Sequence, residues 1–367
     1  MCEEELLYAL ALQRTTGIGD ITAKKLIAHF GSAKDVFQER KKALQKIDGI
    51  GRAMAQTLHK KEALIAAERE LVYLQKNEIR CWYYFEKDYP SRLYHCIDSP
   101  LLLFGKGNID LNVARIISIV GTRKMTAYGQ ATCNSLIEGL KEYNPLIISG
   151  YAYGVDICAH KAALRNELQT IAVLAHGFED IYPKVHGKYT SAMKNHGGFI
   201  TEFWHDNEII QQNFIKRNRI VAGLAEATII IESDSKGGSL VTADIANSYS
   251  RDVYAVPGRW NDKYSRGCNA LISTNEAAIL HSPEELVKNL QWDESPAKPR
   301  SVQKTMFVEL TPVEQQLADY LEKSGRTVLD QIALQNSLKI QETATVLFDM
   351  EMKGVVRPLP GKQFERI

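Results

Sequence analysis

The sequence lacks the features that mark membrane, secreted and disulfide-bonded proteins. It contains no run of about 18 apolar residues, so a membrane-spanning helix is not expected. Residues 1–5 are acidic, which is the wrong sign for a secretory signal. The six cysteines include no C-x-x-C pair, and the nine histidines show no metal-ligand spacing. We therefore expect a cytoplasmic protein with reduced thiols, no metal centre and no contact with a membrane.

Two nucleotide-binding signatures are also missing. There is no G-x-x-x-x-G-K-[ST] loop, which disfavours ATP hydrolysis, and no G-x-G-x-x-G fingerprint with its acidic partner, which disfavours dinucleotide binding. No cofactor is therefore predicted. The formal net charge is only +1, so binding of nucleic acid would have to depend on local patches of charge. An apolar fraction of 45% and a length of 367 residues predict a globular protein of two or three domains.

Residues 1–77 are predicted to form a helical domain with an internal repeat. The tripeptide Gly-Ile-Gly occurs at residues 17–19 and again, 32 residues later, at 49–51, each time before a predicted helix. Glycine takes the positive φ values that a tight turn between helices needs. The repeat resembles a tandem helix-hairpin-helix module, in which turn amides bind a DNA phosphate. The alternative is a compact helical domain without a DNA contact, and the sequence leaves both open.

Residues 78–290 show apolar strands alternating with helices. The strand candidates are residues 116–120, 146–148, 170–174, 199–201, 228–231, 253–256 and 277–280. Near-continuous apolar strands of this kind belong to a parallel sheet that is covered by helices on both faces. The predicted fold class is therefore α/β, with a doubly wound, Rossmann-like central domain. In such a domain the ligand lies at the carboxyl ends of the strands.

The C-terminal part resembles a winged helix. Residues 291–305 are polar and contain two prolines, which predicts a linker. Residues 306–367 contain three predicted helices and then two extended segments. The helices are expected over residues 311–322, 327–335 and 340–353, and the turn between the extended segments at residues 360–361. The candidate recognition helix, residues 341–353, is acidic and apolar, which argues against reading of a DNA groove and favours a protein contact.

The most informative stretch of the chain covers residues 214–243. Lys216, Arg217 and Arg219 lie near the start of a predicted helix. A short apolar strand follows, and then the loop of residues 236–239, Lys-Gly-Gly-Ser, opens another helix. Amides at such a loop and helix start carry partial positive charge. Cations beside this loop therefore predict a phosphate site.

The side chains of this stretch have more than one interpretation. Lys216 and Arg219 are three residues apart, so we expect them on neighbouring helical positions, with Arg217 pointing elsewhere or bracing the site. Phe214 is expected either to stack on an unpaired base or to anchor the helix in the core. Arg217 and Asn218 are equally compatible with bracing the loops.

Further candidates follow the other predicted strands. Gly121, Thr122 and Arg123 offer a backbone amide and a planar guanidinium to a phosphate. Gly150 permits a close approach of the backbone. Asp156 and His160, four residues apart, form an acid/base pair or brace the loop, and we favour bracing because no nucleophile or metal set lies nearby. His176 is similarly expected to be a loop histidine bound by the backbone rather than a catalytic group.

These glycine-rich and basic motifs follow one another in a recognisable order. They are VGTR, SGYAYGVD-x3-H, HGFEDIYP, FIKRNRIVAGL, KGGSLVTA, VPGR and G-x-N-x-L-I, over residues 85–280. The series resembles the DprA/Smf family of DNA-processing proteins, and the long RNRI-x-x-GL block makes the match more specific than any single motif. The resemblance implies an extended Rossmann domain that is flanked by helical or winged-helix modules.

The resemblance also implies a function in natural transformation that is not enzymatic. It implies binding of single-stranded DNA, protection of incoming strands, displacement of single-strand-binding protein, loading of the RecA recombinase, and a homodimer formed through the Rossmann domain. No catalytic residue is implied. The candidate DNA-binding residues, from the motifs and from the resemblance, are Gly121, Thr122, Arg123, Gly150, Phe214, Lys216, Arg217, Asn218, Arg219, Lys236, Gly237, Gly238 and Ser239.

Two positions depart from the pattern of this family. Tyr153 stands where arginine is usual, so an expected cation is missing or replaced by a stacking ring. Gly237 stands where serine is usual, which removes a hydroxyl and loosens the loop.

The rival class is an enzyme, a nucleoside-monophosphate phosphoribohydrolase of the lysine-decarboxylase-like group. Residues 236–242 look somewhat like its P-G-G-x-G-T-x-x-E loop. Those enzymes need a glutamate in this loop, where this chain has Ala243 and Asp244. The rival is therefore disfavoured.

Overall fold

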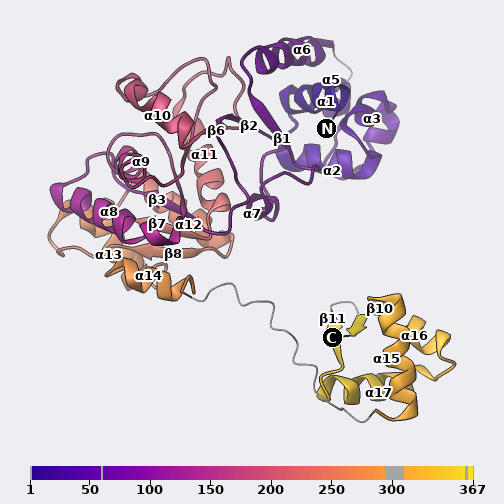
Figure 1. The fold of residues 1–367 in the computed structure, drawn as a ribbon. Coiled ribbons are helices and arrows are strands. Elements are labelled where there is room, and N and C mark those ends of the chain that lie inside the picture. The colour runs from indigo at the N-terminus through magenta and orange to yellow at the C-terminus, as the bar shows by residue number, and fades with distance from the viewer. Residues whose placement is uncertain (1, 59–60, 294–309, 360–362, 367) are drawn as a thin grey trace. The chain divides into compact units, whose positions relative to one another are not determined.

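The computed structural model describes the chain except for residues 1, 59–60, 294–309, 360–362 and 367 (Figure 1). The described chain forms two compact units, Met1–Trp292 and Asp293–Ile367. Most of the predicted linker and the predicted turn at residues 360–361 lie outside the described residues. Within the described parts, none of the helices combines the length and the apolar composition needed to cross a bilayer.

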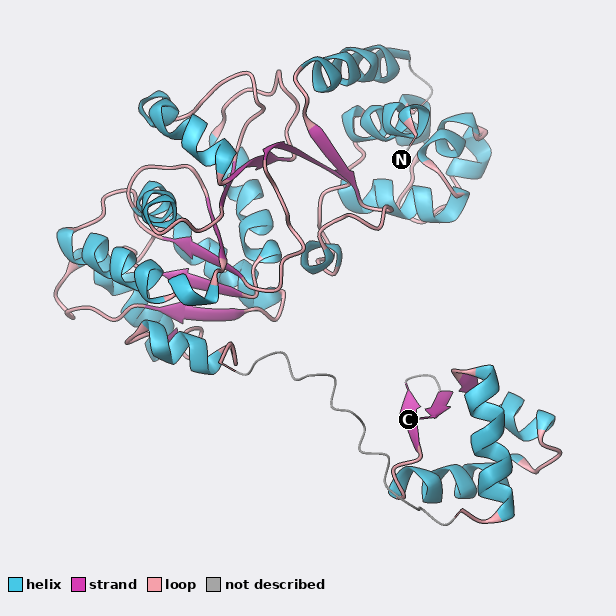
Figure 2. Ribbon diagram, in the orientation of Figure 1, coloured by secondary structure: helices cyan, strands magenta, loops and turns pink. Residues whose placement is uncertain are grey.

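A sheet, whose strands are magenta in Figure 2, organises the larger unit. It has nine strands, in the order β1-β2-β6-β5-β4-β3-β7-β8-β9. Its strands are β1 (Arg80–Tyr83), β2 (Leu102–Gly107), β3 (Ile116–Val120), β4 (Leu146–Ser149), β5 (Thr170–Val173), β6 (Gly197–Thr201), β7 (Ala227–Ile230), β8 (Asp252–Ala255) and β9 (Ala278–Ile279). The seven strands from β3 to β9 are parallel, as predicted. β1 and β2 were not predicted, and they extend the sheet in antiparallel pairing beyond β6.

Helices cover both faces of this sheet. The faces carry α7 (Ser91–Tyr94), α8 (Ala127–Gly139), α9 (Val155–Arg165), α11 (Gln211–Leu224), α12 (Gly238–Ser248), α13 (Arg266–Ser273) and α14 (Pro283–Asn289), and α10 (Thr190–Asn195) precedes β6. Successive strand residues point to opposite faces. Ile117 and Ile147 accordingly pack with α8, α9 and α14, whereas Ile116 and Ile148 pack with α11 and α12. Burial on both sides explains why these strands are apolar throughout, and the doubly wound α/β prediction is confirmed.

The N-terminal helices share a core with one end of the sheet. They are α1 (Glu3–Arg14), α2 (Asp20–Phe30), α3 (Ala33–Gln38), α4 (Lys41–Leu44), α5 (Arg52–Thr57) and α6 (Lys61–Lys76). Leu10 and Leu26 lie in the same buried cluster as Leu102 and Phe104 of β2 and Trp204. The N-terminal helices are therefore fixed to the antiparallel edge of the sheet. That residues 1–77 are a domain of their own stays a prediction.

The smaller unit is a winged helix. It contains α15 (Pro312–Ser324), β10 (Thr327–Val328), α16 (Leu329–Gln335), α17 (Ile340–Met352), β11 (Val356–Leu359) and β12 (Gln363–Arg366), with strand order β10-β12-β11. The side chain of Thr311 and that of Glu314 cap the start of α15 reciprocally. Thr327 and Val328 were predicted to begin a helix, but they pair with Phe364 and Gln363 instead. Pairing across the sheet outweighs local helical preference at these two residues.

Candidate functional site

A groove of about 860 Å³ lies at the carboxyl ends of the parallel strands. Its walls come from the segments that follow β3, β4 and β7 and from α11. β3 and β7 are neighbours, but the chain continues from β3 to β4 on one side and from β7 to β8 on the other. Such a reversal opens a crevice outside the strand ends, which is where doubly wound folds bind their ligands.

The groove brings together all but two of the predicted DNA-binding residues. Those that line it are Gly121, Thr122, Arg123, Gly150, Phe214, Arg217, Asn218, Lys236, Gly237, Gly238 and Ser239. Lys216 and Arg219 do not line it. The motifs are far apart in the sequence, and the parallel sheet brings them to one edge.

The loop after β3 is held closely against its neighbours. A Cβ on Gly121 would lie 2.6 Å from Val155 Cγ2 and 2.8 Å from the carbonyl oxygen of Glu232, so the position requires glycine. The amide of Thr122 donates to the same Glu232 carbonyl at 2.7 Å. Arg123 follows this fixed turn and is exposed, and its guanidinium lies 5.2 Å from the ring centroid of Phe214. The loop therefore presents a cation beside an aromatic ring.

Arg217 supplies a buried cation on the floor of the groove. Its Nη1 donates to the carbonyl of Val173, the last residue of β5, and its side chain lies over Gly150. Burial raises the pKa of the Asp156 carboxyl, and the nearby Arg217 charge opposes that rise. Burial likewise lowers the pKa of Arg217, and Asp156 opposes that change. The position of the guanidinium is thus fixed before any ligand arrives.

The third wall of the groove is the loop that opens α12. Gly237 is the N-cap of this helix, and among the described residues no side chain caps it. The amide of Leu240 donates to the carbonyl of Gly237 at 3.1 Å, which leaves the amides of Gly238 and Ser239 in the first helical turn to bind an anion. A Cβ on Gly237 would lie 2.2 Å from Ser233 Oγ, which also accepts a hydrogen bond from Ser239 Oγ at 2.9 Å. Glycine at this position therefore leaves room for a hydroxyl that comes from residue 233.

Lys216 and Arg219 contact a buried carboxylate outside the groove. Lys216 Nζ lies 2.7 Å from Glu202 Oε2, and Arg219 Nη2 lies 2.5 Å from the same oxygen. Arg219 also pairs with Asp20 of α2 at 3.2 Å. Lys216 and Arg219 thus lie on neighbouring helical positions, as expected, and Arg217 braces the site, which was one of its two expected roles. DNA binding by Lys216 and Arg219 stays a prediction, but their side chains contact this carboxylate rather than the groove. The physical reason is Glu202, just past β6, whose buried charge attracts both cations.

The two histidines considered for catalysis are bound within the fold. His160 is fully buried, with Nδ1 2.7 Å from Thr170 Oγ1 and Nε2 2.6 Å from the carbonyl oxygen of Gly150. Burial lowers its pKa to about 4, so the ring is neutral at pH 7. His176 Nδ1 lies 2.7 Å from the carbonyl oxygen of Gly177. Neither ring lines the groove. Their geometry is that of bracing residues, as expected.

Several residues that line the groove were not predicted from the sequence. The ring of Tyr182 meets the ring of Phe214 edge to face, with centroids 5.8 Å apart. Ile209, Ile210 and Ile215 add an apolar wall, and their residue exposures are 38%, 43% and 52%. Tyr182 belongs to the HGFEDIYP motif, so a signal for it was present in the sequence. Tyr153, in contrast, does not line the groove, and its ring contacts His186 at 5.1 Å.

In each of the two Gly-Ile-Gly turns the first glycine takes the predicted positive φ, whereas Gly19 and Gly51 have φ values of −92° and −78°. Gly17 and Gly49 take φ values of +88° and +89°. At the first repeat, however, Asp20 in the first turn of α2 accepts a hydrogen bond from the amide of Leu101 at 2.9 Å and pairs with Arg219. The carboxylate of Asp20 therefore links the start of α2 to the segment before β2 and to α11. The geometry of the first repeat favours the structural alternative.

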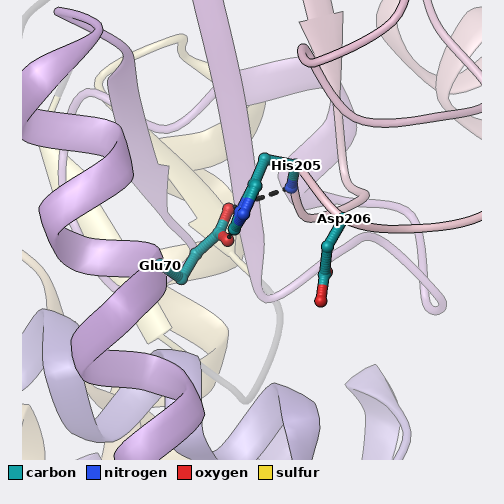
Figure 3. Close-up of side chains that lie close together, drawn as sticks. All are labelled: Glu70, His205 and Asp206. Atoms are coloured by element: carbon teal, nitrogen blue, oxygen red, sulfur yellow. Dashed lines mark hydrogen bonds and ion pairs between the residues drawn. The ribbon is translucent and has the colours of Figure 1, made fainter.

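A histidine and two carboxylates lie close together between α6 and the segment that follows β6 (Figure 3). The Nδ1 atom of His205 bonds to Glu70 Oε2, and the His205 amide donates to Glu70 Oε1 at 3.2 Å. Asp206 pairs with Arg14 at 3.4 Å. The ring of Tyr73 stacks on His205, with centroids 4.1 Å apart. These groups partner one another, and the cluster links α6 to the segment after β6.

The doubly wound sheet and the winged helix define a Rossmann-like protein, with a groove at the switch point of the sheet as its candidate site. Family comparisons identify it further. A family model for DNA recombination-mediator protein A matches residues 80–291, and one for the DprA winged helix domain matches residues 299–362. The chain belongs to the DNA recombination-mediator protein A (DprA/Smf) family, which confirms the resemblance seen in the motifs.

Individual relatives agree with this assignment. Protein Smf of Synechocystis is 28% identical over the full length of both chains, and Protein Smf of Escherichia coli is 32% identical, with 74% of each chain covered. The crystal structure of DNA processing protein A from Streptococcus pneumoniae matches with a TM-score of 0.66 and 28% identity, covering 77% of this chain and 97% of that one. The Helicobacter pylori protein, solved for its single-stranded DNA binding mode, matches with a TM-score of 0.53 and 27% identity, covering 59% and 97%.

Proposed function

We propose that the groove binds single-stranded DNA. The observation that carries the proposal is the convergence of three cations, Arg123, Arg217 and Lys236, on one groove that also contains the uncapped start of α12. Two of these cations are exposed at the rim, and Arg217 is fixed on the floor. The pair of rings from Phe214 and Tyr182 lines the same groove. Cations that follow a backbone and rings that accept any base are the requirements for binding single strands.

The binding should depend on charge and tolerate any sequence. Each phosphate neutralised on a single strand contributes about −0.7 to the slope of log affinity against log salt. Three cations in the groove therefore predict a slope of about −2 from this site alone. Phe214 is half-buried and belongs to none of the core clusters of the described residues, which supports a role at the rim. Its ring or the guanidinium of Arg123 beside it is a surface on which a base stacks.

The proposed cellular role rests on family membership. We infer that the protein acts in DNA uptake and natural transformation, where it protects incoming single strands, contacts single-strand-binding protein and loads the RecA recombinase, with a homodimer as the active form. The support is the family membership and the relative from Helicobacter pylori that was solved for its single-stranded DNA binding mode. Tests are co-sedimentation with RecA on DNA that is covered by single-strand-binding protein, and molar mass in solution. The role is contradicted if the protein is a monomer in solution and does not load RecA onto DNA that is covered by single-strand-binding protein.

Binding rather than catalysis is also what the side chains support. In the rival phosphoribohydrolases the loop of α12 carries a catalytic glutamate. Here Ala243 faces the core, and Asp244 is exposed and does not line the groove. Of the two carboxylates in the groove, Asp156 is held by the amide of Ala152 at 3.3 Å, and Asp234 pairs with Lys263 at 3.5 Å. Release of adenine from AMP would contradict this inference.

The decisive experiment is a titration of fluorescent oligo-dT and of duplex DNA at several salt concentrations. Arg123→Ala and Lys236→Ala should each weaken binding of the single strand and make the salt slope less steep. Lys141→Ala is the matched control, because Lys141 is exposed near the amino end of β4, away from the strand ends that form the groove. If all three variants lose affinity for single-stranded DNA equally, or if none of them loses affinity, the placement of DNA in the groove is contradicted.

A further inference from the structure

One of the four tryptophans is almost fully exposed. Trp260 is 87% exposed, whereas Trp82, Trp204 and Trp292 are 2%, 4% and 5% exposed. Single apolar side chains on a surface are common and need no explanation by themselves. The position of Trp260 beside the groove and the charges around it, however, indicate a role in binding.

Trp260 lies on the loop that follows β8, next to the groove. The amide of Ser233 donates to the carbonyl of Tyr264 at 2.7 Å, and the amide of Gly267 donates to the carbonyl of Ser233 at 2.9 Å. Lys263 pairs with Asp234, a groove residue, at 3.5 Å. Because β8 is the neighbour of β7, the carboxyl end of β8 continues the same edge of the sheet. The loop of Trp260 is therefore a direct extension of the groove wall.

The base of this loop is fixed, while its tip is exposed. Tyr128 Oη donates to the carbonyl of Pro257 at 2.8 Å. The side chain of Asn269 accepts from the amide of Gly258 at 3.2 Å and donates to its carbonyl at 3.0 Å. Residues 259–263 are exposed. Because the loop is already fixed at its base, stacking of a partner on the Trp260 ring costs little conformational entropy.

The charges on this loop are mostly positive. Arg259 and Arg266 are exposed, and neither has an ion-pair partner among the described residues. Lys263 adds a third cation, and Asp262 is the one carboxylate within residues 257–267. An exposed aromatic ring among cations is the pattern by which proteins bind single strands without sequence preference.

We propose that Trp260 is a second base-stacking site, which extends the single-stranded DNA path from the groove across the ends of β7 and β8. This inference rests on the proposed function of the groove. Neighbouring strands are about 4.8 Å apart, so the ends of β3 and β8 are separated by about 10 Å. At the about 3.4 Å spacing of stacked bases this step takes about three nucleotides. Arg259 and Arg266 contact the phosphates on either side of the stacked base.

The exposure pattern makes the test specific. Because the other three tryptophans are buried, quenching of tryptophan fluorescence by DNA reports on Trp260. We expect a dT oligomer of 20 nucleotides to quench the full-length protein, and a dT oligomer of 4 nucleotides, which fills only the groove, to quench it little. Trp260→Ala should lower affinity for the longer strand about tenfold, the size of one lost base–aromatic stack, and leave affinity for the shorter strand unchanged. Trp260→Phe should keep most of the affinity and lose the quenching.

The possible outcomes separate this proposal from the function of the groove. If Arg123→Ala weakens binding but Trp260→Ala binds both strands as the wild type does, the extension is wrong and the groove stands. If Trp260→Ala changes the molar mass in solution together with affinity for both strands, the ring lies in a contact between copies, which overturns the proposal. If the wild type binds no oligonucleotide, the function of the groove fails and the extension fails with it.

Discussion

Arg217 and Arg219 lie two residues apart on α11, yet their guanidinium groups bind on different sides of the helix. Arg217 donates to the carbonyl of Val173 and lines the groove. Arg219 pairs with the buried carboxylate of Glu202 and with Asp20 of α2. Two residues along an α-helix are separated by about 200° around its axis. One helix therefore supplies a cation to the site and a second cation that fastens the N-terminal helices to the sheet.

Removing the second cation should destabilise the fold. Arg219→Leu leaves the buried charge of Glu202 without its closest partner, and breaking a buried ion pair costs about 3–5 kcal/mol. We expect the midpoint of urea unfolding to fall accordingly. Lys216→Ala should cost much less, because about half of that side chain is exposed (49%).

The double variant Arg219→Leu/Glu202→Leu distinguishes two causes of lost stability, the unpaired charge of Glu202 and the changed packing at residue 219. Replacing both partners removes the uncompensated carboxylate, so stability should recover in part relative to Arg219→Leu. Arg219→Leu as stable as the wild type would show that this pair does not hold the N-terminal helices. Arg219 variants should lose apparent affinity for DNA only as far as they lose folded protein.

Gly150 should control the groove without contacting the DNA strongly itself. A Cβ at this position would lie 2.2 Å from Asp156 Oδ2 and 2.5 Å from Arg217 Nη1. Gly150→Ala is therefore expected to displace Arg217 and to weaken binding of oligo-dT about tenfold, the size of one lost hydrogen bond to a charged group. The measurement is a titration by fluorescence anisotropy.

Gly187→Ala is the matched control for that variant. A Cβ on Gly187 would meet no heavy atom within 4 Å, so affinity for oligo-dT should not change. The expectation for Gly150 is contradicted if Gly150→Ala binds DNA as tightly as Gly187→Ala at the same salt concentration.

The sequence predicted the parts of the site that depend on local pattern. Apolar runs located β3 to β9, and because the strands are parallel, the glycines and cations after them had to meet at one edge. The direction of the α11 side chains could not be obtained in this way. Periodicity gives the angle between Arg217 and Arg219, but only the position of Glu202, 17 residues away, and of Asp20, 199 residues away, decides which one faces inward.

The antiparallel edge of the sheet was missed for a related reason. β1 has only four residues, and β2, which has six, carries Gly105 and Gly107, which local propensity disfavours in a strand. Gly107 is required because its Cβ would lie 2.3 Å from the carbonyl oxygen of Gly197 on β6. Pairing with β6, from which the β2 residues are separated by 91 to 97 residues of chain, explains this strand, and the sequence of the strand itself does not.

Acidification should weaken the fold through His160. Burial lowers the pKa of His160 from 6.5 to about 4 in the folded protein. Below pH 6.5 the unfolded chain takes up a proton that the folded protein does not, so stability present at pH 7 is lost as pH falls to 4. At about 1.4 kcal/mol for each pH unit, the loss is about 3 kcal/mol. Lowered pKa values of His176 and His186 add to it, whereas the raised pKa of Glu202 and that of Asp156 oppose it.

Comparison with His160→Asn isolates the contribution of this one ring. The variant should be less stable than the wild type at pH 7, because its side chain replaces two hydrogen bonds imperfectly. The difference between the two proteins should then shrink between pH 6.5 and 4.5 in urea unfolding. A difference that stays constant over this range would contradict the buried, neutral state of His160.

The winged helix should be dispensable for holding a single strand. The groove lies wholly within Met1–Trp292, which is compact by itself. On α17 the exposed surface includes Phe348 (59%) and Met352 (75%) together with the exposed acidic residues Glu342 and Asp349, a combination that repels phosphate. A chain ending at Trp292 should therefore bind oligo-dT within about twofold of the full-length protein, with the same salt slope. The shortened chain should also unfold at the same urea concentration as Met1–Trp292 does within the whole chain. If it does so and its affinity for oligo-dT is nevertheless tenfold lower, the winged helix contributes directly to DNA binding.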